Sequence, residues 1–114
     1  MLKVVTEILP KLPESERYDL CDQLSRSCKA IPRLIAEGYA KRHQKAGFQK
    51  YLDDAMAETN ETSASLEQCR DIYGSRLDQK LCADLIVTYD VLGRQLYILA
   101  VKWRSFDRRP PPSP

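Results

Sequence analysis

The apolar residues of this chain recur at the three- and four-residue spacing of amphipathic α-helices, in four consecutive segments. The first segment is short and should end at Pro10 and Pro13, because proline lacks a backbone donor and crowds the preceding turn. Its apolar side chains are Leu2, Val5, Ile8, Leu9 and Leu12. The pattern therefore predicts one stunted helix followed by three long ones.

The second segment is predicted to begin after Ser15, a good N-cap residue, and to last to about Lys41 or His43. Its apolar positions alternate steps of three and four residues, and they are Cys21, Leu24, Cys28, Ile31, Ile35 and Gly38. Pro32 lies inside this segment. We expect it to bend the helix, because one backbone hydrogen bond is lost there.

The third segment is predicted to begin near Lys45 and to end at Gly74, a natural helix C-terminal residue. Its seam consists of Phe48, Leu52, Ala55, Thr59, Thr62, Leu66, Cys69 and Tyr73. The centre of the segment, residues 59–65, is small and polar. We expect close helix packing or a partner at this centre.

The fourth segment, for which Ser75 is the predicted cap, carries two neighbouring apolar stripes. One stripe is Leu77, Leu81, Leu85, Thr88, Leu92, Leu96, Leu99, Trp103 and Phe106, and the other is Cys82, Ile86, Tyr89, Gly93 and Leu96. So wide an apolar arc exceeds what one bundle core needs, so we expect neighbouring subunits to cover part of it.

Short connections between consecutive helices make neighbours antiparallel. The sequence thus predicts an all-α, up-down-up-down antiparallel four-helix bundle with a short first helix, over residues 1–107. Residues 108–114 contain four prolines and should form a flexible, polyproline II-like tail. A length of 114 residues fits one domain.

The composition excludes several classes of protein. A chain that is 43% hydrophobic and 30% charged is not wholly disordered, and only four glycines argue against phosphate loops and β-rich folds. The chain contains no run of about 18 apolar residues, which a membrane-spanning helix would need. Its first residues do not resemble a signal peptide. We expect a cytoplasmic protein that does not contact a membrane.

No constellation of catalytic or metal-binding residues is evident. Cys21, Cys28, Cys69 and Cys82 contain no Cys-x-x-Cys pair, so we expect reduced cysteines that pack as small hydrophobic residues. His43 is the only histidine and lies in a basic turn, which leaves no base for a nucleophile and too few ligands for a di-iron site. The prediction is a protein without enzymatic activity, metal or cofactor.

Charge is distributed unevenly along the chain. In an antiparallel bundle, residues 39–50 and 102–109 meet at one end, with eight basic residues against Asp107 alone, a net charge of +7. We call these eight the basic pole: Lys41, Arg42, Lys45, Lys50, Lys102, Arg104, Arg108 and Arg109. The remaining ten basic and 15 acidic residues give −5. Such a pole attracts phosphate backbones, but it also serves solubility. Tyr39, Tyr51 and Trp103 lie near it, for base stacking or for packing.

The segment Ala30-Ile31-Pro32-Arg33-Leu34-Ile35-Ala36-Glu37-Gly38-Tyr39 resembles the Ile-Pro-x-x-Ile-Ala-Glu-Gly signature of the bacterial four helix bundle proteins. These are also called large-subunit ribosomal RNA intervening-sequence proteins. The flanking Leu12-Pro13-x-Ser15-Glu16-Arg17-Tyr18 and Phe48-x-x-Tyr51-Leu52-x-x-Ala55 agree with it. The resemblance covers most of residues 10–70. The chain departs from the family pattern at Arg33-Leu34, where Ser-Asn is usual. The turn between its second and third predicted helices is longer, and its first helix is shorter.

The resemblance implies a homopentameric ring and kinship with the accessory variability determinant of diversity-generating retroelements, which binds a reverse transcriptase and nucleic acid. It implies no catalytic activity. It also marks Ile31, Pro32, Ile35, Glu37, Gly38 and Tyr39 as motif or interface candidates. For Glu37 we expect a partner at the helix bend or an intersubunit Arg, because a carboxylate near an interior needs one.

Two functions follow from these patterns. The first is a ring-forming scaffold that engages RNA, DNA or a nucleic-acid enzyme such as a reverse transcriptase through the basic pole. Its candidate contact residues are Lys41, Arg42, Lys45, Lys50, Lys102 and Arg104. The alternative is a purely structural or protein-interaction oligomer without a nucleic-acid role, which the modest net charge of +2 favours.

Overall fold

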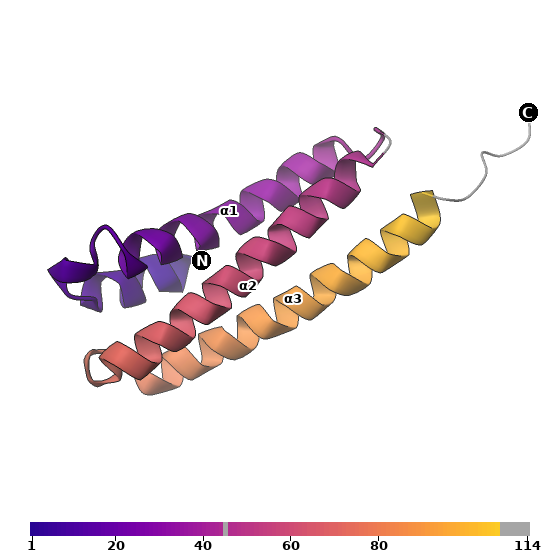
Figure 1. The fold of residues 1–114 in the computed structure, drawn as a ribbon. Coiled ribbons are helices and arrows are strands. Elements are labelled where there is room, and N and C mark those ends of the chain that lie inside the picture. Colours follow the sequence, from indigo (N-terminus) through magenta and orange to yellow (C-terminus); the bar gives the residue numbers. More distant parts are fainter. Residues whose placement is uncertain (45, 108–114) are drawn as a thin grey trace, which may run out of the picture.

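The computed structural model describes residues 1–44 and 46–107, and these residues form helices and turns without a strand (Figure 1). The N-terminal segment contains η1 (Val4–Ile8), η2 (Leu9–Lys11) and η3 (Glu14–Glu16). Three long helices follow, α1 (Leu20–Ala40), α2 (Gly47–Tyr73) and α3 (Gln79–Asp107), with the turn η4 (Gly74–Arg76) before α3. The predicted all-α fold, with one short and three long helical segments packed as a bundle, is confirmed. The predicted tail over residues 108–114 lies outside the described residues.

The short first helix is irregular. η1 is a π-helical turn, in which the Leu9 N–H donates to the Val4 carbonyl, and η2 is a 3-10 turn that contains Pro10. Leu12 is extended, with φ −77° and ψ 147°, so the helix ends between the two prolines as predicted. Val4 and Ile8 are fully buried, so the segment is held by its apolar side chains rather than by regular backbone geometry.

Two predicted caps are wrong. Ser15 lies in η3, which starts from the extended Pro13, and α1 begins only at Leu20. Ser75 lies in η4, and the side chain of Asp78 caps α3 by accepting a hydrogen bond of 3.1 Å from the Leu81 N–H. In both places a short 3-10 turn intervenes between the connection and the helix.

Gly74 does follow the last residue of α2, but its φ of −55° is right-handed. A 3-10 turn, η4, therefore ends the helix in place of a left-handed cap. The Gln79 side chain donates a hydrogen bond to the Gly74 carbonyl. Among the described residues, the one left-handed backbone position is Ala46, with φ 60°, immediately before α2. α1 continues through Pro32 to Ala40, and the bend predicted at Pro32 stays a prediction.

The interior consists of two apolar clusters. In the first, Val4 and Ile8 of the N-terminal segment pack with α1, α2 and α3 around Leu24 and Leu66, which are fully buried. The second lies toward the α1–α2 turn and is built on Phe48, Leu52, Ala55, Leu96 and Ala100. The N-terminal segment therefore covers one half of the bundle, and three helices alone form the other (Figure 1).

Hydrogen bonds join the centres of the three long helices. Ser27 of α1 accepts a 2.8 Å hydrogen bond from Thr62 of α2, and Ser63 of α2 donates to Asp90 of α3 at 2.9 Å. Thr59, Thr62, Ser63 and Ser65 are all buried. The close helix packing predicted at the small, polar centre of α2 is thus confirmed.

Candidate functional site

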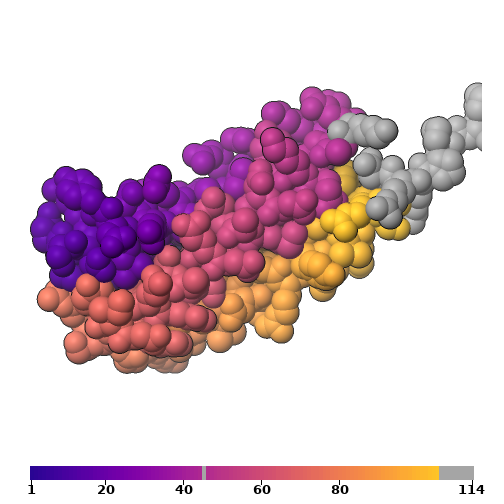
Figure 2. Space-filling model, viewed as in Figure 1, coloured from indigo at the N-terminus to yellow at the C-terminus, as the bar shows by residue number. Residues whose placement is uncertain are grey.

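The described members of the basic pole come from the α1–α2 turn and two helices and lie at one end of the bundle. The rings of Phe48 on α2 and Trp103 on α3 pack edge to face, with centroids 4.8 Å apart, which places the last turns of α3 beside the start of α2. The described pole residues are Lys41, Arg42, Lys50, Lys102 and Arg104, and all five are exposed. Figure 2 shows the α1–α2 turn and the end of α3 at the same end of the molecule. Lys45, Arg108 and Arg109 lie outside the described residues.

Two of these cations are held against tyrosine side chains. The Lys41 ammonium donates to the Tyr51 hydroxyl at 2.9 Å and lies 5.1 Å from the ring centre. This hydrogen bond and the nearby Tyr51 charge raise the pKa of Lys41. The Arg42 guanidinium lies 4.0 Å above the Tyr39 ring and donates to the Tyr39 carbonyl at 2.8 Å. These contacts orient both positive charges at the surface.

The three aromatic residues near the pole divide into two roles. Trp103 is half-buried and packs on Phe48, so its role is packing rather than stacking on a base. Tyr51 is half-buried and Tyr39 is 57% exposed, and each carries a cation on its ring. An exposed tyrosine with a guanidinium on its face is a surface suited to a planar, negatively charged ligand.

Acidic residues also lie near the pole. Asp53 and Asp54 are exposed on the second turn of α2, and Asp53 accepts a hydrogen bond from Gln49 at 3.1 Å. Glu37 is exposed and pairs with Arg33 one turn earlier in α1, at 3.9 Å. Glu37 therefore has an Arg partner within its own helix, and the intersubunit Arg stays a prediction. Its neighbour Gly38 takes the position that faces α2, and the next residue along a helix points about 100° away.

The signature segment serves the fold within one chain. Ile31 is buried, and a Cβ added at Gly38 would meet the Cβ of Tyr51 at 2.6 Å, so α1 and α2 approach closely there. Ile35 is half-buried, whereas Pro32 and Tyr39 are exposed. The close helix approach at Gly38 therefore involves α2 of the same chain.

An apolar groove of about 270 Å³ runs between α1 and α3. Ile31, Pro32 and Ile35 form one wall, and Leu85, Thr88 and Leu92 form the other. Met1, at the start of the N-terminal segment, also lines it. The groove was not predicted from the sequence. Its signal was the first stripe of the last helix, which contains Leu85, Thr88 and Leu92, combined with a first helix too short to cover it.

A polar recess of about 320 Å³ lies between α1 and α2. It places Arg26 and Arg33 of α1 opposite Glu58 and Glu61 of α2. Partial burial, followed by the charge of Glu61, raises the pKa of Glu58. Arg26 and Arg33 form ion pairs within α1, with Asp22 and Glu37, so the charges of this recess are largely those of solvated helix faces.

The model of the 23S rRNA-intervening sequence protein family matches residues 1–97. The chain belongs to this family. The match includes the signature segment and the α1–α2 turn, but it ends at Tyr97, so Lys102 and Arg104 lie beyond it. No curated protein and no solved structure matches the chain.

The cysteines of this family member are free and lie in or beside the first apolar cluster, as predicted. Cys28, Cys69 and Cys82 are fully buried, and burial raises the pKa of each thiol, that of Cys69 to about 12. His43 is exposed in the turn after α1. Over residues 1–44 and 46–107, no group of three or more His, Cys, Asp or Glu side chains is placed to hold a metal ion. None of the helices described there has the length and apolarity to cross a bilayer.

Proposed function

We propose that this intervening-sequence protein is a non-enzymatic, cytoplasmic scaffold that engages nucleic acid, or a nucleic-acid enzyme such as a reverse transcriptase, through the basic pole. The subunit is an antiparallel up-down-up-down bundle, and five subunits form a ring. The observation that carries this proposal is the set of five exposed cations gathered at one end of the bundle.

Electrostatics favours phosphate as the ligand of the pole. Lys41 and Arg42 are already oriented by Tyr51 and Tyr39, so binding costs less side-chain entropy than for free cations. A ring multiplies the number of such poles that one strand can touch, which strengthens a weak individual interaction. The resemblance to the retroelement accessory protein supports the same class of partner.

A filter-binding titration with a structured RNA and a duplex DNA, at about 50 and 200 mM salt, tests the proposal. The triple variant Lys41→Gln, Arg42→Gln, Lys102→Gln should bind more weakly than the wild type. The slope of its log-affinity against log-salt should shrink by about 0.7–0.9 for each phosphate that the variant no longer neutralises. The matched control Lys11→Gln, Lys29→Gln, Lys80→Gln removes three exposed charges outside the pole and should bind like the wild type.

The absence of RNA and DNA binding by the wild type at low salt would contradict the nucleic-acid function. A structural or protein-interaction oligomer is the second candidate. It is favoured by the exposed apolar residues of α3, among them Val87, Tyr97 and Ile98 at 59%, 62% and 52% exposure.

A further inference from the structure

Tyr39 and Arg42 form a flat, positively charged surface at the basic pole. The Arg42 guanidinium lies 4.0 Å from the centre of the Tyr39 ring, and a 2.8 Å hydrogen bond to the Tyr39 carbonyl holds it there. The Tyr39 ring in turn packs edge to face with the ring of Phe48, at a centroid distance of 6.3 Å, and Phe48 is buried. The core thus supports the tyrosine, and the tyrosine supports the guanidinium. We call Tyr39 and Arg42 the stacked pair.

The stacked pair is accessible to a ligand. Both of its residues are exposed, and no carboxylate within residues 1–44 and 46–107 forms an ion pair with Arg42. A guanidinium is planar and more weakly hydrated than an ammonium, and its N–H groups lie in its plane. A nucleic-acid base can therefore stack on its free face while an N–H group on its edge donates to a phosphate oxygen.

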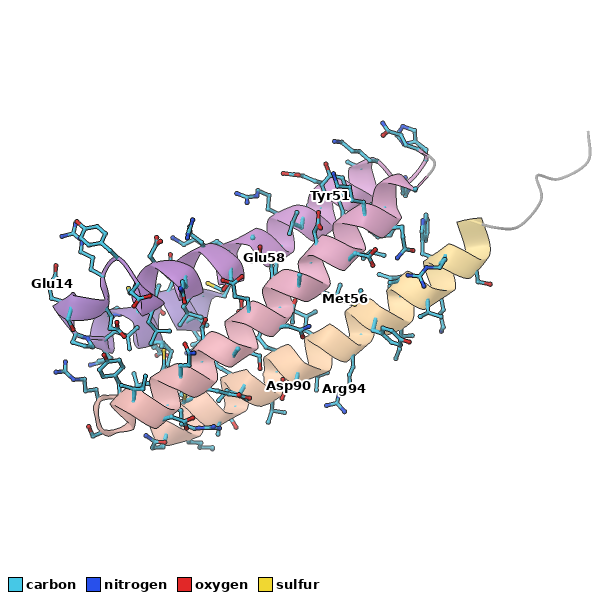
Figure 3. All side chains as sticks on the ribbon, in the orientation of Figure 1. Glu14, Tyr51, Met56, Glu58, Asp90 and Arg94 are labelled. Atoms are coloured by element: carbon cyan, nitrogen blue, oxygen red, sulfur yellow. The ribbon has the colours of Figure 1, made fainter. Side chains whose placement is uncertain are left out.

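A second tyrosine–arginine pair, at the other end of the bundle, has the opposite electrostatic surroundings. Arg17 lies 5.2 Å from the centre of the Tyr18 ring, and Tyr18 is exposed. Arg17 is paired with Glu14 at 3.4 Å, however, and residues 14–19 contain three acidic side chains against one basic. Figure 3 shows Glu14 and Tyr51 at opposite ends of the molecule. Acidic neighbours repel a phosphate from this second pair, whereas the stacked pair lies among cations.

A stacking surface distinguishes an unpaired strand from a duplex. In a duplex the bases stack on one another, so a protein side chain reaches only their edges and the sugar–phosphate backbone. In an unpaired strand a base can turn outward and stack on a guanidinium or an aromatic ring. Electrostatics alone gives no preference for the single strand, because duplex DNA has the higher charge density and releases more counterions for each phosphate neutralised. Tighter binding of a single strand is therefore a sign of stacking.

We propose that the basic pole binds unpaired nucleotides, with one base stacked on Arg42 and the neighbouring phosphates held by Lys41 and Lys50. The inference rests on the proposed nucleic-acid function and names the class of nucleic acid that the pole prefers. Tyr39 acts through Arg42, because its ring and its carbonyl keep the guanidinium in place before the strand arrives. The hydrogen bond from Lys41 to Tyr51 orients a second cation in the same way.

Fluorescence anisotropy with a labelled DNA strand of about 16 nucleotides, free of self-complementarity, and with its duplex measures both affinities. The wild type should bind the single strand more tightly than the duplex. Arg42→Lys keeps the positive charge but removes the planar surface, so it should lower the ratio of single-strand to duplex affinity about fivefold or more. The salt dependence of binding should stay the same, because the number of charges does not change.

Two tyrosine variants test the support of the guanidinium. Tyr39→Leu should lower the same ratio, because Arg42 loses the ring on which it lies. Tyr18→Leu, at the acidic end, is the matched control and should keep the wild-type ratio. If the wild type binds the duplex as tightly as the single strand, or if Arg42→Lys keeps the wild-type ratio, the stacking is wrong although nucleic-acid binding stands. A wild type that binds neither probe would instead overturn the proposed function, and this inference with it.

Discussion

Replacing Gly38 by alanine tests whether the signature glycine is required for the approach of α1 to α2. The added Cβ would lie 2.6 Å from the Tyr51 Cβ and 2.9 Å from Cδ1 of Phe48. Carbon atoms in contact prefer about 3.5–4.0 Å, so the two helices must separate by roughly 1 Å. Neither neighbour can rotate away, because a Cβ is fixed to its backbone and Phe48 is 4% exposed.

Two opposing effects decide whether Gly38→Ala raises or lowers the free energy of unfolding. Overpacking of a close approach costs about 1–3 kcal/mol. Alanine is favoured over glycine in a helix interior by about 1 kcal/mol, which offsets part of this cost. We expect Gly38→Ala to lower the free energy of unfolding by up to about 2 kcal/mol. The shift of Tyr51 and Phe48 should also weaken the interactions that orient Lys41 and position Trp103.

Gly93→Ala is the matched control, because a Cβ there would meet Thr59 and Asn60 at the ordinary distances of 3.7 and 3.8 Å. It should gain about 0.5–1 kcal/mol from helix propensity. Urea denaturation followed by circular dichroism measures both variants, at one protein concentration because assembly contributes to apparent stability. A Gly38→Ala protein as stable as Gly93→Ala would refute the reasoning.

Three further predictions concern the bend, the thiols and the pole. Pro32→Ala should give little of the ~3 kcal/mol that helix propensity offers, or should lose assembly, because we expect the bend to shape the subunit; a much more stable variant with unchanged oligomer mass contradicts this. Thiols in the unfolded chain ionise near pH 9, whereas burial keeps Cys69 protonated to about pH 12. The unfolded state then binds fewer protons, so the free energy of unfolding should fall as pH rises from 9 towards 12, and Cys69→Ala should reduce this fall in urea titrations. Tyr51→Phe should return the pKa of Lys41 towards its ordinary value of 10.5, as measured by NMR titration, and an unchanged pKa would show that the hydrogen bond is not its cause.

Much of the candidate site could be predicted from the sequence because it depends on helix order. Charges at the end of one helix and the start of the next are brought together by a short turn, as for Lys41, Arg42 and Lys50. The packing of Phe48 on Trp103 then adds the end of α3. The exposed position of Glu37 could not be predicted in this way. Adjacent helix residues point about 100° apart, so Gly38 can face α2 while Glu37 faces solvent.

The apolar groove could not be predicted from the apolar pattern of the helices, because it depends on how much of α1 and α3 the N-terminal segment covers. Leu85 and Leu92 have the same apolar periodicity as fully buried residues. Whether the space between α1 and α3 is filled depends on how far the N-terminal segment extends over these helices, and Met1 of this segment only lines the groove. The path of this segment results from packing of Val4 and Ile8 on three other helices.

The sequence by itself determined the all-α fold, the four helical segments and most of the interior, because apolar side chains at helical spacing gain free energy only when one face of the helix is buried. Leu24, Leu52 and Leu66 follow this pattern and are fully buried. Only the tertiary structure decided the π-helical first turn, the cap at Asp78 and the pairing of Lys41 with Tyr51. The first depends on packing against distant helices, the second on a local competition between a 3-10 turn and the helix, and the third on two helices meeting. The first and the third depend on distances between helices, and none of the three is contained in the periodicity of a single segment.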